Sequence, residues 1–182
     1  STPVTVTILK PTDSRQYSDT AGSSCRFAAE WMKNTGIFVG ESLDGNPCFS
    51  PEKQVTRGEL LTMLVKTLNL PTDAAITETG YKDAPAWLKP YLAAAVRSGL
   101  IAAMPARDTF GYNDPVTAEE TASLLCAALE LDSQNADVSD ALAIAEENGF
   151  CLTSGTYITR ADTARLLYQA SKLAEEDANS DF

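Results

Sequence analysis

Apolar residues recur with helical spacing in three separate stretches of the chain. A spacing of i, i+3, i+4 and i+7 places side chains on one face of an α-helix. The residues with this spacing are Leu61, Leu64, Val65 and Leu68 in the first stretch, Leu125, Ala128 and Leu129 in the second, and Leu166, Leu167, Ala170 and Leu173 in the third. Each stretch is therefore predicted to form an amphipathic helix.

A start signal precedes each of these helices. A threonine is followed three residues later by an acid, in the pairs Thr56–Glu59, Thr117–Glu120 and Thr159–Asp162. With glutamate this pattern is the capping box, in which the hydroxyl and the carboxylate bind each other's backbone N–H groups. The helices are therefore predicted to begin just after the threonines.

A weaker apolar pattern precedes each of these helices and ends at a glycine, namely Gly36, Gly99 or Gly149. Glycine readily adopts the left-handed conformation that ends many helices. Pro90 fits only a first helical turn, so its helix should start near Lys89. The first helix of the third stretch is predicted to be short. The result is an all-α fold of six helices in three helix-loop-helix units.

The three stretches share a layout that indicates tandem repeats. Each opens with an aromatic residue or valine, a polar residue and an aspartate, and the offset of seven residues from Phe49 to Thr56 recurs from Phe110 to Thr117. The third stretch lacks most of the connecting loop. The predicted units are a first repeat at 17–70, a second at 81–131 and a shortened third at 137–175.

Two terminal segments lie outside these units. In residues 1–16, Val4, Val6 and Ile8 alternate with threonines, which predicts a short N-terminal β-strand or linker. Residues 176–182 form an acidic tail that is expected to fray. Within the first repeat, Asp44-Gly45-Asn46 is predicted to be a turn, because it lacks the alternating oxygen ligands of a calcium loop.

Charge narrows the classes of partner. The formal net charge of −11 argues against nucleic acid and anionic membrane surfaces, both of which select basic proteins. No stretch is long and apolar enough to insert into a membrane. The N-terminal residues do not resemble a signal peptide, so a secreted form would need a leader outside this chain.

The chain contains no histidine, which removes the usual catalytic triads and the commonest metal ligand. No glycine-rich phosphate loop occurs, and no cysteine pair has zinc-site spacing. We therefore expect no enzymatic activity, no cofactor and no metal site. An enzyme built on carboxylates alone is the remaining catalytic alternative.

Four cysteines allow two disulfides in a secreted protein. Their order suggests the pairs Cys25–Cys48 and Cys126–Cys151. The alternative for Cys126 is a small core residue in an apolar helix stripe.

Arg57 and Arg160 directly follow the capping threonines and occupy the first helical position. A cation there opposes the helix dipole at a cost of about 0.3–1 kcal/mol. Two roles would explain an arginine at this position. A guanidinium beside a helix N-terminus makes a carboxylate or phosphate site, or it forms a salt bridge to an acid of a neighbouring repeat.

Asp19, Asp83 and Trp87 are the remaining candidate ligand-binding residues. The aspartates recur before the first helices, where a turn or cap role competes with a role as ligand or arginine partner. Trp87 fits either stacking on a sugar face or packing over the core.

The combined pattern resembles the S-layer homology family. Its motifs are an aromatic-x-Asp opening, Gly-Ile-x-x-Gly, Phe-x-Pro and a Thr-Arg-Ala-Glu helix start. The first repeat matches with Tyr17-Ser18-Asp19, Gly36-Ile37-Phe38-Val39-Gly40, Phe49-Ser50-Pro51 and Thr56-Arg57-Gly58-Glu59. The second carries Ala118 in place of the arginine and Ala103 in place of the second glycine, whereas the third keeps Thr159-Arg160-Ala161-Asp162.

The resemblance implies a pseudo-threefold helical bundle of three repeats, part of a larger secreted protein at the bacterial cell surface. Members of the family bind anionic, often pyruvylated, secondary cell-wall polysaccharides in grooves between repeats. The motif arginine is among their ligand-binding residues and carries over only to Arg57 and Arg160. The alternative is a degenerate module that serves protein–protein contact or S-layer assembly without binding a glycan.

Overall fold

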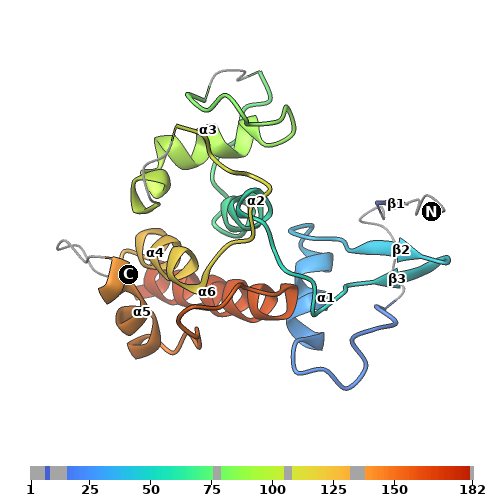
Figure 1. Cartoon of the computed structure of the whole chain (residues 1–182). Coiled ribbons are helices and arrows are strands. Elements are labelled where there is room, and N and C mark those ends of the chain that lie inside the picture. The colour runs from blue at the N-terminus through green and yellow to red at the C-terminus, as the bar shows by residue number, and fades with distance from the viewer. Residues whose placement is uncertain (1–6, 9–15, 76–78, 105–107, 132–137, 181–182) are drawn as a thin grey trace.

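The computed structural model describes residues 7–8, 16–75, 79–104, 108–131 and 138–180. The chain is mostly helical with a small β element, in agreement with the predicted fold class (Figure 1). The described helices are α1 (Arg26–Asn34), α2 (Arg57–Thr67), α3 (Lys89–Arg97), α4 (Ala118–Ala128), α5 (Val138–Glu147), α6 (Arg160–Ser180) and the short 3₁₀ helix η1 (Leu100–Ala103). None of the helices described combines the length and apolar character needed to cross a bilayer.

The local start and stop signals act as predicted. Thr56 and Thr117 form capping boxes with Glu59 and Glu120. Asp162 gives Thr159 the same reciprocal pair of backbone hydrogen bonds. The glycines that follow α1, α3 and α5 have φ values of 73°, 82° and 83°, as the left-handed conformation requires.

Two expectations about helix length are wrong. Helix α5 has 10 residues, against nine in α1 and in α3, so the first helix of the predicted third unit is not short. The acidic tail is not frayed as far as Ser180, because α6 continues to that residue.

The β element is a three-stranded antiparallel sheet of β1 (Thr7–Ile8), β2 (Glu41–Leu43) and β3 (Asn46–Cys48). The predicted N-terminal strand is present as β1; its other two expected positions, Val4 and Val6, lie outside the described residues. The predicted turn joins β2 to β3, where Asp44 and Gly45 have φ values of 50° and 78°. Such a turn matches the twist of a hairpin. The hairpin projects from the helical body (Figure 1).

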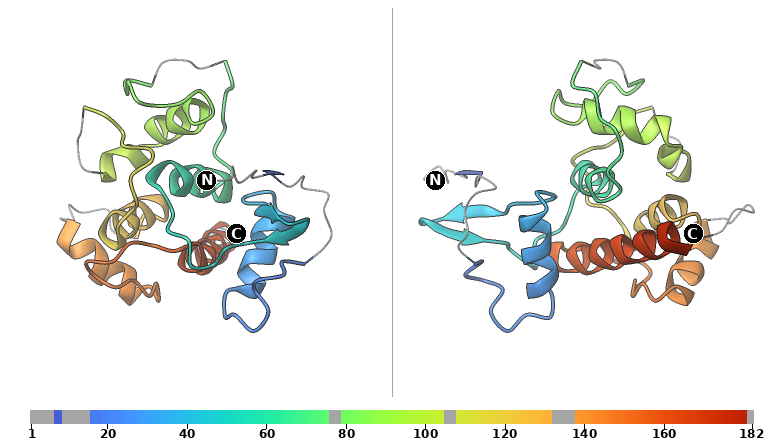
Figure 2. Two further views of the ribbon diagram at one scale, coloured as in Figure 1. Left: turned by 45° about the vertical axis from the view of Figure 1, so that its right-hand side comes forward. Right: turned by 180° about the vertical axis from the view of Figure 1, so that it is seen from behind.

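Helices pack across the boundaries of the three predicted segments. Helix α3 packs on α2, α5 packs on α4, and α1 packs on α6. The first helix of each sequence segment therefore contacts the second helix of the preceding segment, and α1 closes the circle with α6. Figure 2 shows α1 beside one end of the long α6 in both views.

The segments just before α2, α4 and α6 meet in a closed ring of backbone hydrogen bonds. Val55 donates to the carbonyl of Ile158 at 2.9 Å, Ile158 donates to Val116 at 3.1 Å, and Val116 donates to Val55 at 3.0 Å. All three side chains are buried. The ring therefore fixes the N-terminal ends of the three helices, where the candidate arginines lie, against one another.

Candidate functional site

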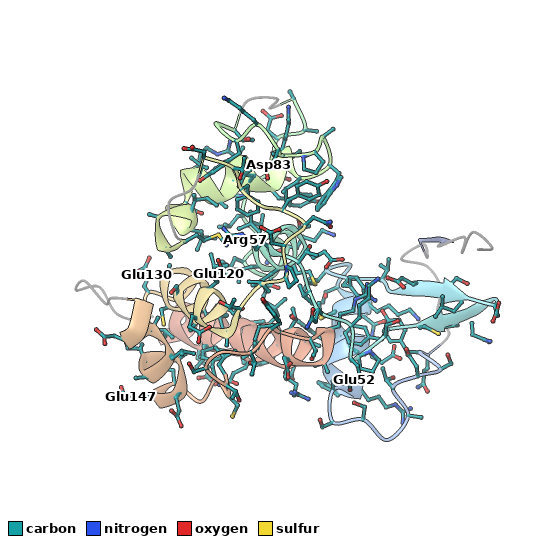
Figure 3. The ribbon with its side chains drawn as sticks, viewed as in Figure 1. Glu52, Arg57, Asp83, Glu120, Glu130 and Glu147 are labelled. Carbon is teal, nitrogen blue, oxygen red and sulfur yellow. The ribbon has the colours of Figure 1, made fainter. Side chains whose placement is uncertain are left out.

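Arg57 is buried at the start of α2, with 2% of its surface exposed. Its Nη1 forms an ion pair with Glu120 on α4, and Figure 3 labels both residues. Its Nε donates to the carbonyl of Phe110 at 2.9 Å. The guanidinium carbon also lies 5.2 Å from the centre of the Phe110 ring. Of the two roles open to Arg57, this geometry corresponds to the salt bridge between neighbouring segments.

Arg160 makes an equivalent set of contacts at the start of α6. Its Nη1 donates to the carbonyl of Phe49 at 2.9 Å, and its Nη2 pairs with Glu41 on β2 at 2.5 Å. Glu41 also pairs with Lys53 at 2.9 Å. Burial alone would raise the pKa of Glu41, but the bonds from Arg160 and Lys53 outweigh it and lower that pKa. Glu41 is therefore a carboxylate at neutral pH.

Asp19 and Asp83 both accept hydrogen bonds from backbone N–H groups. The Asp19 carboxylate accepts the N–H groups of Phe49 at 2.8 Å and of the next residue at 2.7 Å. Asp83 accepts those of Phe110 and of the glycine after it, each at 2.7 Å. Desolvation would raise the pKa of Asp83, but these backbone hydrogen bonds prevail and lower it.

Four of the five candidate residues thus form two matching links. In each link the peptide groups of one phenylalanine join an aspartate of its own segment to an arginine of another segment. Asp19 and Arg160 meet at Phe49, and Asp83 and Arg57 meet at Phe110. These contacts hold the connecting loops against the helix starts.

The start of α4 meets the loop of the third segment at a third junction between segments, and the contacts there differ from the two arginine links. Ala118 stands where the other two junctions have arginine, and its N–H donates to the carbonyl of Thr156 at 2.9 Å. The adjacent Glu119 accepts hydrogen bonds from Ser154 Oγ at 2.9 Å and from the Gly155 N–H at 2.7 Å. A carboxylate therefore binds the shortened loop in place of a guanidinium.

Trp87 is half exposed, at 50%, and its ring meets that of Tyr112 edge-on. It lines a pocket of about 380 Å³, here called the Trp87 pocket, together with Arg160. The other residues that line it are Gly36, Ile37, Phe38, Val39, Gly40, Glu41, Glu59, Thr62, Met63 and Lys66. Its volume is in the range of small-ligand sites. The structure therefore brings two of the five candidates to one cavity.

The cations of the Trp87 pocket differ in their partners. Arg160 pairs with Glu41, as described above. The Lys66 Nζ donates to the carbonyls of Gly36 at 3.2 Å and Ile37 at 3.3 Å, at the C-terminal end of α1. Desolvation lowers the pKa of Lys66. The described contacts of Lys66 therefore include two carbonyl groups and no carboxylate.

A second pocket, of about 350 Å³, adjoins the first and is here called the Tyr91 pocket. The two share Gly36 and Lys66. The remaining residues that line it are Thr35, Val65, Asn69, Leu70, Thr72 and Tyr91. A ligand bound in one pocket would therefore lie close to the other.

The expected disulfides are not formed. All four cysteines are free thiols, with Cys25, Cys48 and Cys126 buried and Cys151 exposed. The Sγ of Cys126 contacts the carbonyl of Ala141 at 3.5 Å, in accordance with the alternative that it is a core residue.

Sequence reasoning missed Lys66, Glu41 and Glu120. Glu120 was identified as a capping residue, yet only one of its oxygens faces Thr117, and the other pairs with Arg57. Glu41 precedes the predicted turn without any pattern that marks it. Lys66 had one signal, since it is the only charged residue in the second half of α2.

Parts of the chain are related to bacterial S-layer proteins. It is 30% identical over 115 residues to the Surface-layer 125 kDa protein of Lysinibacillus sphaericus, a match covering 62% of this chain and 9% of the relative. It is 33% identical over 86 residues to the S-layer protein sap of Bacillus anthracis and to an S-layer protein of Bacillus thuringiensis subsp. finitimus, covering 47% of this chain and 10% of each relative. The chain thus spans about a tenth of the length of these relatives. No family model matches it.

Proposed function

We propose that this chain is a non-catalytic, extracellular anchoring module that holds a larger bacterial surface protein to an anionic cell-wall polysaccharide. In this proposal residues 17–70, 81–131 and 137–175 are three S-layer-homology-like repeats arranged with pseudo-threefold symmetry. The relationship to S-layer proteins supports the location at the cell surface. The closed ring through Val55, Val116 and Ile158 supports the threefold arrangement.

The observation that carries the proposal is the Trp87 pocket. It combines a half-exposed indole ring with the cations Arg160 and Lys66, and it also contains the carboxylates of Glu41 and Glu59. Aromatic faces suit the C–H surface of a pyranose ring, and cations suit an acidic substituent on it. The first segment supplies its Gly36–Gly40 wall. The second segment has η1 at the corresponding place, so the cleft is proposed at one junction only.

The test is co-sedimentation of the purified chain with cell-wall sacculi that carry their secondary polymer, beside sacculi stripped of it. Replacing Trp87 with alanine should weaken binding about tenfold or more, as loss of a central aromatic anchor does. Trp87→Phe should recover part of it, because an aromatic face is restored. The control is Phe27→Ala, which removes a more exposed aromatic ring, 69% exposed, from α1. Equal binding of wild type to both kinds of sacculi would refute polymer recognition.

One observation favours the alternative, protein–protein contact without a glycan. Phe27 packs edge-on against Tyr168 on α6, which also meets Trp31, so three aromatic rings cluster on one surface. Exposed apolar clusters often mark protein interfaces. Sedimentation velocity over a range of concentrations is the test. The alternative requires assembly that Phe27→Ser abolishes, together with no preference for polymer-bearing sacculi.

A further inference from the structure

Lys66 lies where the two neighbouring pockets meet. Its Nζ contacts the carbonyl of Gly36, which lines both pockets, and that of Ile37, which lines the Trp87 pocket. Its charge is also 5.9 Å from the centre of the Tyr91 ring. An ammonium group has three N–H donors. The two carbonyl contacts therefore leave one donor for a ligand.

The two candidate arginines are already paired with carboxylates. Arg57 is closed off by Glu120, and Arg160 shares Glu41 with Lys53. An anionic ligand at either arginine would have to displace a carboxylate. In contrast, no carboxylate of the described residues lies within ion-pair distance of Lys66 Nζ. Its positive charge, partly removed from water, faces two carbonyl dipoles and the ring of Tyr91.

The Tyr91 pocket extends the cleft beyond Lys66. It presents the exposed amide of Asn69 and the half-buried ring of Tyr91, groups that can bind hydroxyls and pack on a sugar ring. Each pocket alone is of ligand size. Two adjacent pockets with a cation between them match a chain of at least two sugars better than a single sugar.

We propose that Lys66 is the anion-binding residue of this protein, and that an acidic oligosaccharide spans the Trp87 and Tyr91 pockets with its carboxylate or phosphate on the lysine ammonium. This inference rests on the proposed function, because it presupposes that a glycan occupies the cleft. Under this proposal Arg57 and Arg160 stabilise the fold. Lys66, which lies outside the Thr-Arg motif at the helix starts, binds the acidic group of the ligand.

The experiment compares Lys66→Met, Lys66→Arg and a control, Lys172→Met, in binding of the full chain to polymer-bearing sacculi. Methionine retains most of the apolar stem and removes the charge. Lys66→Met should bind about tenfold or more weakly, because a charge-assisted hydrogen bond is lost. Lys66→Arg should bind within a few-fold of wild type. Lys172 pairs with Glu175 on the exposed side of α6, so its replacement should have no effect.

Competition distinguishes the source of the anion. Synthetic amino-sugar disaccharides with a carboxylate, a phosphate or no charge are added to the sacculi-bound chain. Release by either acidic disaccharide, and not by the neutral one, supports the proposal and identifies the anion. Equal release by all three overturns the anion role.

A spectroscopic measurement on the wild-type chain tests the same contact without a substitution, so its result does not depend on whether the variants fold. The carbon-13 signal of the Lys66 ε-methylene, followed during a pH titration, should show a higher lysine pKa once the acidic disaccharide binds. Binding of Lys66→Met within twofold of wild type, while Trp87→Ala is weakened, would overturn the lysine assignment and leave the anchoring function intact. Failure of the wild type to prefer polymer-bearing sacculi would instead refute both.

Discussion

Replacing Arg57 with alanine is expected to lower the free energy of unfolding by about 3–5 kcal/mol, because it removes the cation from a buried ion pair with the Glu120 carboxylate. Both side chains are almost completely buried. The carbonyl of Phe110 also loses its guanidinium donor. Urea denaturation followed by circular dichroism measures the change.

The matched control is Lys53→Ala. Lys53 likewise forms an ion pair with a glutamate, Glu41, but the lysine side chain is 52% exposed. Exposed pairs contribute about 0–1 kcal/mol. An Arg57→Ala variant as stable as the Lys53→Ala variant, yet unable to bind polymer-bearing sacculi, would contradict the structural role and return Arg57 to the ligand site.

A second large effect is expected at Gly40. An alanine there would place its Cβ 2.5 Å from Tyr17 Cε1 and 2.6 Å from the backbone oxygen of Cys48, at a φ of +79°. The left-handed conformation costs roughly 1–2 kcal/mol for a residue with a Cβ, and overpacking costs about 1–3 kcal/mol more. Gly40→Ala should therefore destabilise the chain by about 2–5 kcal/mol. Thermal denaturation measured by calorimetry tests it.

Gly36 provides the comparison, because it shares the conformation without the crowding. Its φ is +73° and no atom lies within 4 Å of the Cβ position. Gly36→Ala should cost about 1–2 kcal/mol, from the backbone alone. Equal destabilisation by both substitutions would show that the contact with Tyr17 and Cys48 is not close in solution.

What the sequence predicts well is local. The threonine-to-acid spacing places the starts of α2, α4 and α6, and glycines place the ends of α1, α3 and α5, because each signal acts within one helical turn. The Asp44-Gly45 turn is recognised for the same reason. The hairpin around it is missed, since β2 and β3 have only three residues each and lack an alternating pattern.

What the sequence does not predict is which segments meet. The packing of α1 on α6 joins the two ends of the chain, and no local pattern records such a contact. For the same reason the arginines are recognised as unusual cations, whereas their partners Glu120 and Glu41 are not. The Trp87 pocket takes residues from all three segments, so only Trp87 and Arg160 of its members are candidates by sequence. Their role in binding stays a prediction.

The pairing of α1 with α6 has a consequence for how the protein unfolds. In an open array of repeats, each unit contacts only its neighbours, and the array can melt gradually from its ends. Here the described helix pairs form a closed circle, so each of the three segments packs against both of the others. Loss of any one segment would leave the remaining two each with an unpaired helix. The three segments should therefore unfold together in a single cooperative transition, and the slowest step of folding should be the closure that brings α1 and α6 together across the length of the chain.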